Sequence, residues 1–188
     1  MNDDERSIGK LTVRDVAVEG ERVLVRSDLN VPLEDGVITD DSRIKASLPT
    51  IRYLLDHDAR VIVCSHLGRP KGYDERLSLA PVAGRMANLL DREVLLASDC
   101  VGPEAERAVE SMGDNILLLE NLRFHPEEEA NDPGFARQLA SLADVYVDDA
   151  FGASHRAHAS TEGVTHYLPA VAGLLMESEV RYLSALVA

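Results

Sequence analysis

Basic and amide side chains follow four short apolar runs of this sequence. The polar segments are residues 26–32, 65–70, 120–125 and 148–158, and a further arginine, Arg43, opens a helical pattern. Arginine is suited to a phosphorylated or carboxylated ligand, because its planar guanidinium binds either group through two parallel hydrogen bonds. The chemistry that these segments indicate is the capture of a small, highly charged anion.

The candidate ligands divide into cation-rich and acceptor groups. Asp28 and Asn30 offer acceptor oxygens, which suit the hydroxyls of a polyol acid better than its charges. The side chains expected to hold the charged groups are Arg43, His66, Arg69, Arg123 and Arg156. On a chain with net charge −14 they would form a local positive basin in a negative field.

Each candidate residue could instead have a purely structural role. A single arginine after a strand is more often part of a surface ion pair. Asp28 and Asn30 could shape a turn ahead of Pro32, and His66 alone could be an ordinary loop histidine. What favours the binding reading is the convergence of the arginines at several strand ends.

Two acidic segments are interpreted as unrelated to ligand binding. Asp148 and Asp149 are adjacent at a strand end, where neighbouring side chains point to opposite faces, so they are not expected to share a metal ion. Residues 127–129 are three consecutive glutamates and are interpreted as a solvated acidic loop.

The elements that must position these residues alternate between strand and helix patterns. The apolar runs 22–25, 60–64, 94–97, 116–119 and 145–147 are continuous rather than alternating, as in strands buried on both faces of a parallel sheet. Residues 44–55 and 82–90 have helical periodicity. Asp132 and Pro133 predict a helix start, and Gly113 a helix end. The pattern predicts a doubly wound, Rossmann-like α/β fold with a mainly parallel sheet in three α/β/α layers, whose ligands bind at the carboxyl ends of the strands.

Composition excludes several classes of protein. The chain has 188 residues, 33 of them acidic and 19 basic, which argues against a nucleic-acid partner. No apolar run is long enough to span a membrane, and the start of the sequence is not a signal peptide. Cys64 and Cys100 have no metal-ligand spacing, so a reducing cytoplasm is expected. The acidic surface, with lysine only at positions 10, 45 and 71, indicates a halophile; an acidic protein of a mesophile is the alternative.

No nucleotide-binding motif is present. The sequence contains neither GxxxxGK[ST] nor GxGxxG, and Gly68 and Gly152 stand alone in their loops. No serine nucleophile lies in an elbow motif. Taken alone, the residues describe an α/β domain that binds a small phosphorylated or carboxylated anion, without cofactor or metal.

Several segments resemble the phosphoglycerate kinase family, in order and at its spacing. They are VRSDLNVP, ITDDSRI, SHLGRPKG, LLLENLRFHPEEE, NDP and VYVDDAFGASHRAHAST, and the resemblance, to bacterial-type members, runs from about residue 11 to residue 176. Ser27, Leu29 and Asp148 depart from the family pattern, which usually has Val, Phe and Asn there. A carboxylate at position 148 would weaken anion binding slightly.

The resemblance implies a two-domain glycolytic enzyme that transfers a phosphoryl group between 1,3-bisphosphoglycerate and ADP, giving 3-phosphoglycerate and ATP. Residues 1–172 would be the phosphoglycerate-binding N-terminal domain and residues 173–188 the start of the interdomain helix. The C-terminal domain that binds Mg-ATP or Mg-ADP would be absent, so this chain is expected to be inactive alone. The full enzyme is expected to be a monomer.

The family's substrate ligands, transferred residue by residue, form the set already found at the strand ends. Arg43 would stabilise charge on the transferring phosphoryl group, and the others would hold the acceptor. The implied ligands are Asp28, Asn30, Arg43, His66, Arg69, Arg123 and Arg156. Two alternatives stay open: a stand-alone module that binds phosphorylated acids, and an interaction role for the final helix.

Overall fold

The structure is a computed structural model that describes residues 11–187, with side chains described as far as Ala185. Its centre is a six-stranded sheet with the order β5-β6-β4-β1-β7-β8, in which every paired strand runs parallel to its neighbour. The strands are β1 (Arg22–Ser27), β4 (Arg60–Cys64), β5 (Val94–Leu96), β6 (Ile116–Leu118), β7 (Val145–Asp149) and β8 (Ala170–Ala172). The predicted doubly wound α/β fold is confirmed.

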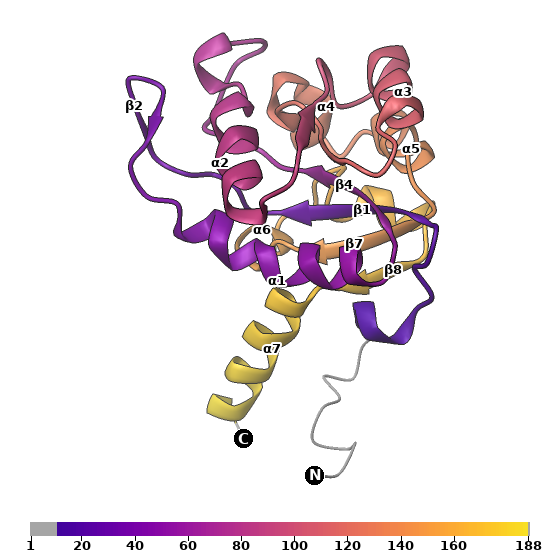
Figure 1. Ribbon diagram of the computed structural model, residues 1–188. Coiled ribbons are helices and arrows are strands. Elements are labelled where there is room, and N and C mark those ends of the chain that lie inside the picture. Colours follow the sequence, from indigo (N-terminus) through magenta and orange to yellow (C-terminus); the bar gives the residue numbers. More distant parts are fainter. Residues whose placement is uncertain (1–10, 188) are drawn as a thin grey trace.

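Helices cover both faces of the sheet and complete three layers. Figure 1 shows α1 and α7 on one side of the sheet and α3 and α5 on the other. The helices are α1 (Ser42–Asp56), α2 (Ala80–Leu90), α3 (Gly102–Ser111), α4 (Pro126–Glu129), α5 (Pro133–Ser141), α6 (Phe151–Ser154) and α7 (Leu174–Val187). Short 3-10 helices occupy Val13–Asp15, Glu75–Leu77, Leu122–Phe124 and Gly163–His166.

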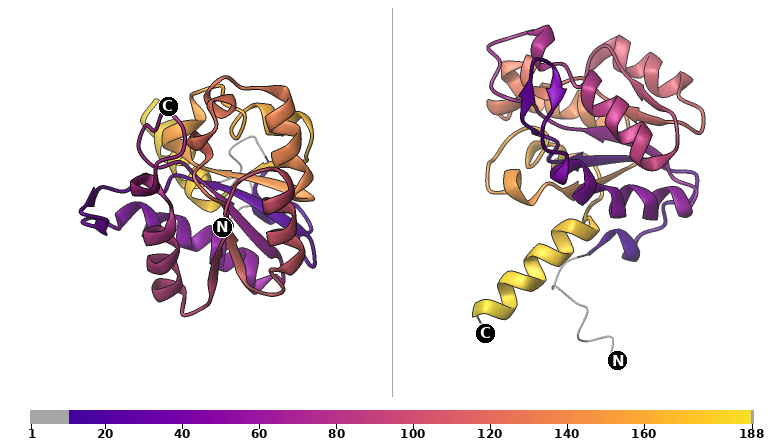
Figure 2. Two further views of the ribbon diagram at one scale, coloured as in Figure 1. Left: turned by 90° about the horizontal axis from the view of Figure 1, so that it is seen from above. Right: turned by 60° about the vertical axis from the view of Figure 1, so that its left-hand side comes forward.

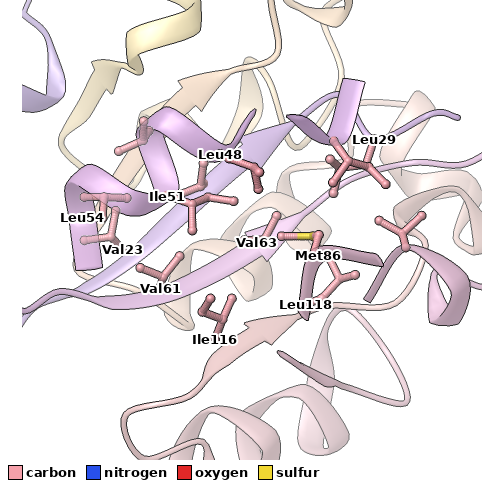
Figure 3. Close-up of a cluster of buried hydrophobic side chains, with 14 of the residues drawn as sticks. Val23, Leu29, Leu48, Ile51, Leu54, Val61, Val63, Met86, Ile116 and Leu118 are labelled. Carbon is pink, nitrogen blue, oxygen red and sulfur yellow. The ribbon is translucent and has the colours of Figure 1, made fainter. Parts of the chain in front are cut away.

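The core lies in two clusters because successive strand residues point to opposite faces. Val23 and Val25 of β1 pack in the cluster beneath α1 and α2, whereas Leu24 packs in the cluster beneath α3 and α5. Figure 3 shows Ile51 of α1 lying against the strand valines of the first cluster. Burial on both faces explains why these strands have continuous apolar sequences.

Local signals in the sequence set several helix boundaries. Asp132 caps α5, since its Oδ1 accepts a hydrogen bond from the backbone N–H of Phe135 at 2.8 Å, and Pro133 fills the first helical position. Gly113 follows the end of α3 with φ +58°, a left-handed conformation that glycine adopts without strain. Both predicted boundaries are confirmed.

Among the strands, β8 and the pair β2 (Leu33–Glu34) and β3 (Val37–Ile38) were not predicted from the sequence. β8 is an edge strand of only three residues, Ala-Val-Ala, which is too short to give a pattern. β2 and β3 form an outlying hairpin. Its turn is made by Asp35 and Gly36, both at positive φ, as in a two-residue hairpin turn.

The final helix projects away from the body of the molecule (Figures 1 and 2). Its first turn is anchored, because Met176 is buried, whereas Tyr182 and Leu183 are 66% and 43% exposed. Leu183 therefore presents apolar surface on this helix. The side chains of Leu186 and Val187 lie outside those described, and Ala188 lies outside the described residues. Within residues 11–187 no helix is long and apolar enough to cross a membrane.

Candidate functional site

The seven candidate ligands line one pocket at the carboxyl ends of the strands. The pocket has a volume of about 270 Å³ and is formed by loops after β1, β4, β6 and β7, together with the start of α1 and with α6. Its lining residues are Asp28, Asn30, Arg43, His66, Gly68, Arg69, Arg123, Gly152, Ala153 and Arg156. The structure thus brings together every side chain that the sequence singled out, and their role as ligands stays a prediction.

The loop after β1 supplies the acceptor groups. The Asp28 carboxylate is only 15% exposed and forms an ion pair with the half-exposed guanidinium of Arg43, at the start of α1. Asp28 Oδ1 also accepts a hydrogen bond from the backbone N–H of Asn30 at 3.3 Å. Asp28 therefore shapes the turn ahead of Pro32, which was one of its two predicted roles, and also orients Arg43 of the pocket.

The backbone of Gly68 joins three of the loops that form the pocket. Asn30 Oδ1 accepts a hydrogen bond from the Gly68 N–H at 2.8 Å, and Arg123 Nη1 donates to the Gly68 carbonyl at 2.8 Å. Gly68 has φ +63°, and a Cβ there would lie 2.9 Å from the Leu77 side chain. Glycine is favoured at this position chiefly by backbone conformation, since the tip of the Leu77 side chain could shift to admit a Cβ.

His66 is held neutral in the pocket. His66 is 7% exposed, and its Nδ1 lies 3.0 Å from Nη2 of Arg26. Burial, followed by the positive charges of Arg26, Arg123 and Arg156, lowers the pKa of His66 to about 2. His66 can therefore offer an anion one N–H hydrogen bond, but no formal charge.

The arginines of the pocket have different surroundings. Arg123 is buried, its Nε lies 3.3 Å from Glu129 Oε1, and burial is the main cause that lowers its pKa from the ordinary value. Arg69 and Arg156 are exposed, and neither has a carboxylate partner within the described residues. Four guanidinium groups and one carboxylate line the pocket, so its charge suits a ligand with more than one negative group.

Behind the pocket lies a buried carboxylate, in a segment for which the prediction of a solvated loop was wrong. Residues 127–129 belong to α4 rather than to a solvated loop, and Glu128 is completely buried. Its carboxylate accepts hydrogen bonds from the backbone and the hydroxyl of Ser160, and Ser160 Oγ accepts from Arg26 Nε at 2.8 Å. One signal was available: Arg26 extends a strand buried on both faces, and a buried arginine requires acceptors.

Asp148 and Asp149 differ in environment, as expected from their alternation on β7. Asp149 is fully buried, and its Oδ1 accepts hydrogen bonds from the N–H groups of Leu175 and Met176 at 2.9 and 3.2 Å, in the first turn of α7. Asp148 is partly exposed, and its Oδ1 accepts from the N–H of Ala150. Burial is the main cause that raises the pKa of Asp149 to about 6.

Two larger hollows lie elsewhere on the surface. One, of about 760 Å³, runs along β8 and α7 and has no basic lining residue; the other, of about 690 Å³, lies between the hairpin and α2. The single arginine of the second hollow, Arg85, is already paired with Asp41 at 2.6 Å. Charge, rather than size, distinguishes the pocket at the strand ends as the candidate anion site.

Residues 13–188 match the family model described as "Phosphoglycerate kinase". A relative with that name from Moorella thermoacetica is 65% identical over 178 residues, which are 94% of this chain and 45% of that protein. The chain therefore spans about half the length of the curated relatives that it matches.

Solved structures agree with this match. The structure of phosphoglycerate kinase from Coxiella burnetii is similar with a TM-score of 0.83 and 40% identity, over 93% of this chain and 44% of that one. The corresponding protein from Pyrococcus horikoshii gives a TM-score of 0.85 at 34% identity, over 93% and 45% of the two chains.

Proposed function

This chain belongs to the phosphoglycerate kinase family, and on that premise we propose that it forms the half of the enzyme that binds phosphoglycerate. In this proposal the pocket at the strand ends takes 3-phosphoglycerate or 1,3-bisphosphoglycerate. The observation that carries it is that all seven candidate ligands, drawn from loops far apart in the sequence, line one pocket.

Size and charge of the pocket support a three-carbon acid phosphate as its ligand. A volume of about 270 Å³ is at or below the lower end of the range for drug-sized ligands. Arg69, Arg123 and Arg156 supply positive charge for phosphate or carboxylate, while Asp28 and Asn30 supply acceptors for a hydroxyl. Arg43, about half exposed at the rim, is proposed to stabilise charge on the transferring phosphoryl group.

The nucleotide and its magnesium ion are proposed to bind outside this chain. Within the described residues, the one group of three possible metal ligands is Asp99, Cys100 and His125. A thiol and an imidazole are not the all-oxygen set that magnesium prefers. We place the donor site in a further domain of the full-length protein, with residues 1–172 as the acceptor domain and residues 173–188 as the start of the connecting helix.

A direct test is titration of the chain with 3-phosphoglycerate by NMR. Without a donor domain the ligand stays partly solvated and its ion pairs are screened, so a dissociation constant on the order of 0.1–10 mM is expected. Signals from Arg43, His66, Arg69, Arg123 and Arg156 should shift first.

Arg69→Ala and Arg76→Ala form a matched pair for this titration. Both arginines are exposed and near each other in sequence, but Arg76 is paired with Asp74 and does not line the pocket. Arg69→Ala should weaken binding about tenfold, the effect of losing one charge-assisted hydrogen bond, whereas Arg76→Ala should leave it unchanged. Shifts that cluster elsewhere, or equal effects of the two variants, would contradict the proposal.

The cytoplasmic location and the halophilic source stay proposals. They are supported by the two unpaired cysteines, both buried, and by the excess of 33 acidic over 19 basic residues.

A further inference from the structure

A chain of buried polar side chains lies behind the pocket and does not line it. Its members are Glu128 of α4, Ser160 and Arg26 of β1, which are 0%, 0% and 1% exposed. A charged pair of this kind is costly to bury unless each member is held by hydrogen bonds.

Ser160 is the centre of this chain. Its backbone N–H donates to Glu128 Oε2 at 2.9 Å, and its carbonyl accepts from the hydroxyl of Tyr146 at 2.7 Å. Its hydroxyl donates to Glu128 Oε1 at 2.5 Å and accepts from Arg26 Nε at 2.8 Å. The hydroxyl proton therefore has one orientation, toward Glu128, and the arginine is held through the oxygen.

Arg26 connects Ser160 to His66, which lines the pocket. Its Nη1 donates to the Ser27 carbonyl at 2.5 Å, and its Nη2 lies 3.0 Å from His66 Nδ1. A guanidinium can only donate, so Nδ1 of His66 must accept and carries no proton. The proton of the neutral ring is then on Nε2, the polar atom that remains for an anion in the pocket.

We propose that Glu128 and Ser160 are positioning residues that act through Arg26 to fix His66 as the Nε2–H tautomer, so that it presents a hydrogen-bond donor to the bound anion. The hydrogen bond to a bound anion rests on the proposed function, whereas the tautomer of His66 does not. Glu128 also supplies the negative charge that balances Arg26 beneath a pocket lined by four other arginines.

The test is nitrogen-15 NMR of the His66 ring in the 188-residue chain, as a function of pH. The wild type should show one neutral tautomer, with Nδ1 unprotonated, and no titration of His66 between pH 4 and 8. Ser160→Ala removes the hydroxyl link, and Glu128→Gln removes the charge while keeping an acceptor oxygen. Glu127→Gln is the matched control, because Glu127 is an exposed residue of the same helix.

In Ser160→Ala and Glu128→Gln, a second tautomer of the neutral ring should appear. The pKa of His66 should stay low, because burial and the charges of Arg123, Arg156 and the neighbouring His158 still disfavour its protonation. Affinity for 3-phosphoglycerate near neutral pH should fall about three- to tenfold, because part of the population no longer presents the Nε2–H donor. Glu127→Gln should match the wild type in each measurement.

Two results would overturn the proposal. One is a folded Ser160→Ala or Glu128→Gln variant whose His66 tautomer is unchanged. The other is a wild-type ring protonated on Nδ1, which decides the matter even if neither variant folds. A wild-type chain with the expected tautomer but no affinity for 3-phosphoglycerate would instead contradict the proposed function and leave the positioning role standing.

Discussion

Asp149 offers a sharp test of how the final helix is joined to the body. Its buried carboxylate accepts hydrogen bonds from two backbone N–H groups of α7 through Oδ1, while Oδ2 has no hydrogen-bond partner among the described residues. Burial raises the pKa of Asp149 and is its largest cause, while a hydrogen bond from the Thr50 side chain and those from the start of α7 lower it by less. The perturbation is Asp149→Asn, which keeps the Oδ1 acceptor and removes the charge.

The magnitude follows from the shift of the pKa between the unfolded and folded states. The value rises from 3.8 to about 6 on folding, and each unit corresponds to about 1.4 kcal/mol, so the total is roughly 3 kcal/mol. Because the folded state binds the proton more tightly, this stabilisation is complete below pH 3.8 and is lost as pH rises through about 6. About 2 kcal/mol of it should be lost between pH 4.5 and 7.5.

The assay is urea denaturation of wild type and Asp149→Asn at several values between pH 4.5 and 7.5. The free energy of unfolding of the variant, relative to wild type, should rise by about 2 kcal/mol over this interval. Asp114→Asn, at an exposed position, should show no comparable trend. A difference that is flat, or that falls with pH, would refute the reasoning and show that the N-terminus of α7 outweighs burial.

Three further outcomes are expected. The midpoint of thermal unfolding should rise between low and molar KCl, because salt screens the repulsion among 33 carboxylates; a flat or falling midpoint would contradict the halophile prediction. Gly173→Ala should destabilise by more than about 2 kcal/mol, since its Cβ would lie 2.1 Å from Asp149 Oδ1. Gly84→Ala, in helix α2 with nothing within 4 Å, should stabilise by about 0.5–1 kcal/mol, and equal effects of the two substitutions in denaturant would refute this contrast. The 188-residue chain should show no phosphoryl transfer in a coupled assay, because positioning of both substrates supplies most of the rate; turnover near that of a full-length enzyme would contradict the division into two domains.

The sequence predicted strand positions best, because the burial of a strand residue depends on the strand to which it belongs. The continuous apolar runs located five of the six strands of the sheet. Because parallel strands end at one edge, the side chains after those runs could be assigned to one site from their positions in the chain alone. β1 extends to Ser27, beyond the predicted end, and the side chain of Arg26 in this extension is hydrogen-bonded by Ser160, far along the chain.

What could not be predicted depends on contacts between distant residues. Glu128 looks like its exposed neighbours in sequence, and only the return of the chain at Ser160 explains its burial. The buried partner of the His66 ring is likewise Arg26, which is 40 residues away in the sequence. Periodicity reports the face on which a residue lies, but not which polar group meets it there.

The two hydrogen bonds to the Gly68 peptide have a consequence for how the site can move. Gly68 belongs to the loop after β4. Asn30 of the loop after β1 accepts a hydrogen bond from the N–H of Gly68, and Arg123, after β6, donates one to its carbonyl. None of the three can swing outward alone without breaking a hydrogen bond, so their displacements are correlated and the pocket opens as a unit. The entropy of arranging these loops is then lost during folding rather than on arrival of a ligand. A substitution in one loop should therefore be felt at the other two, even where it touches no ligand.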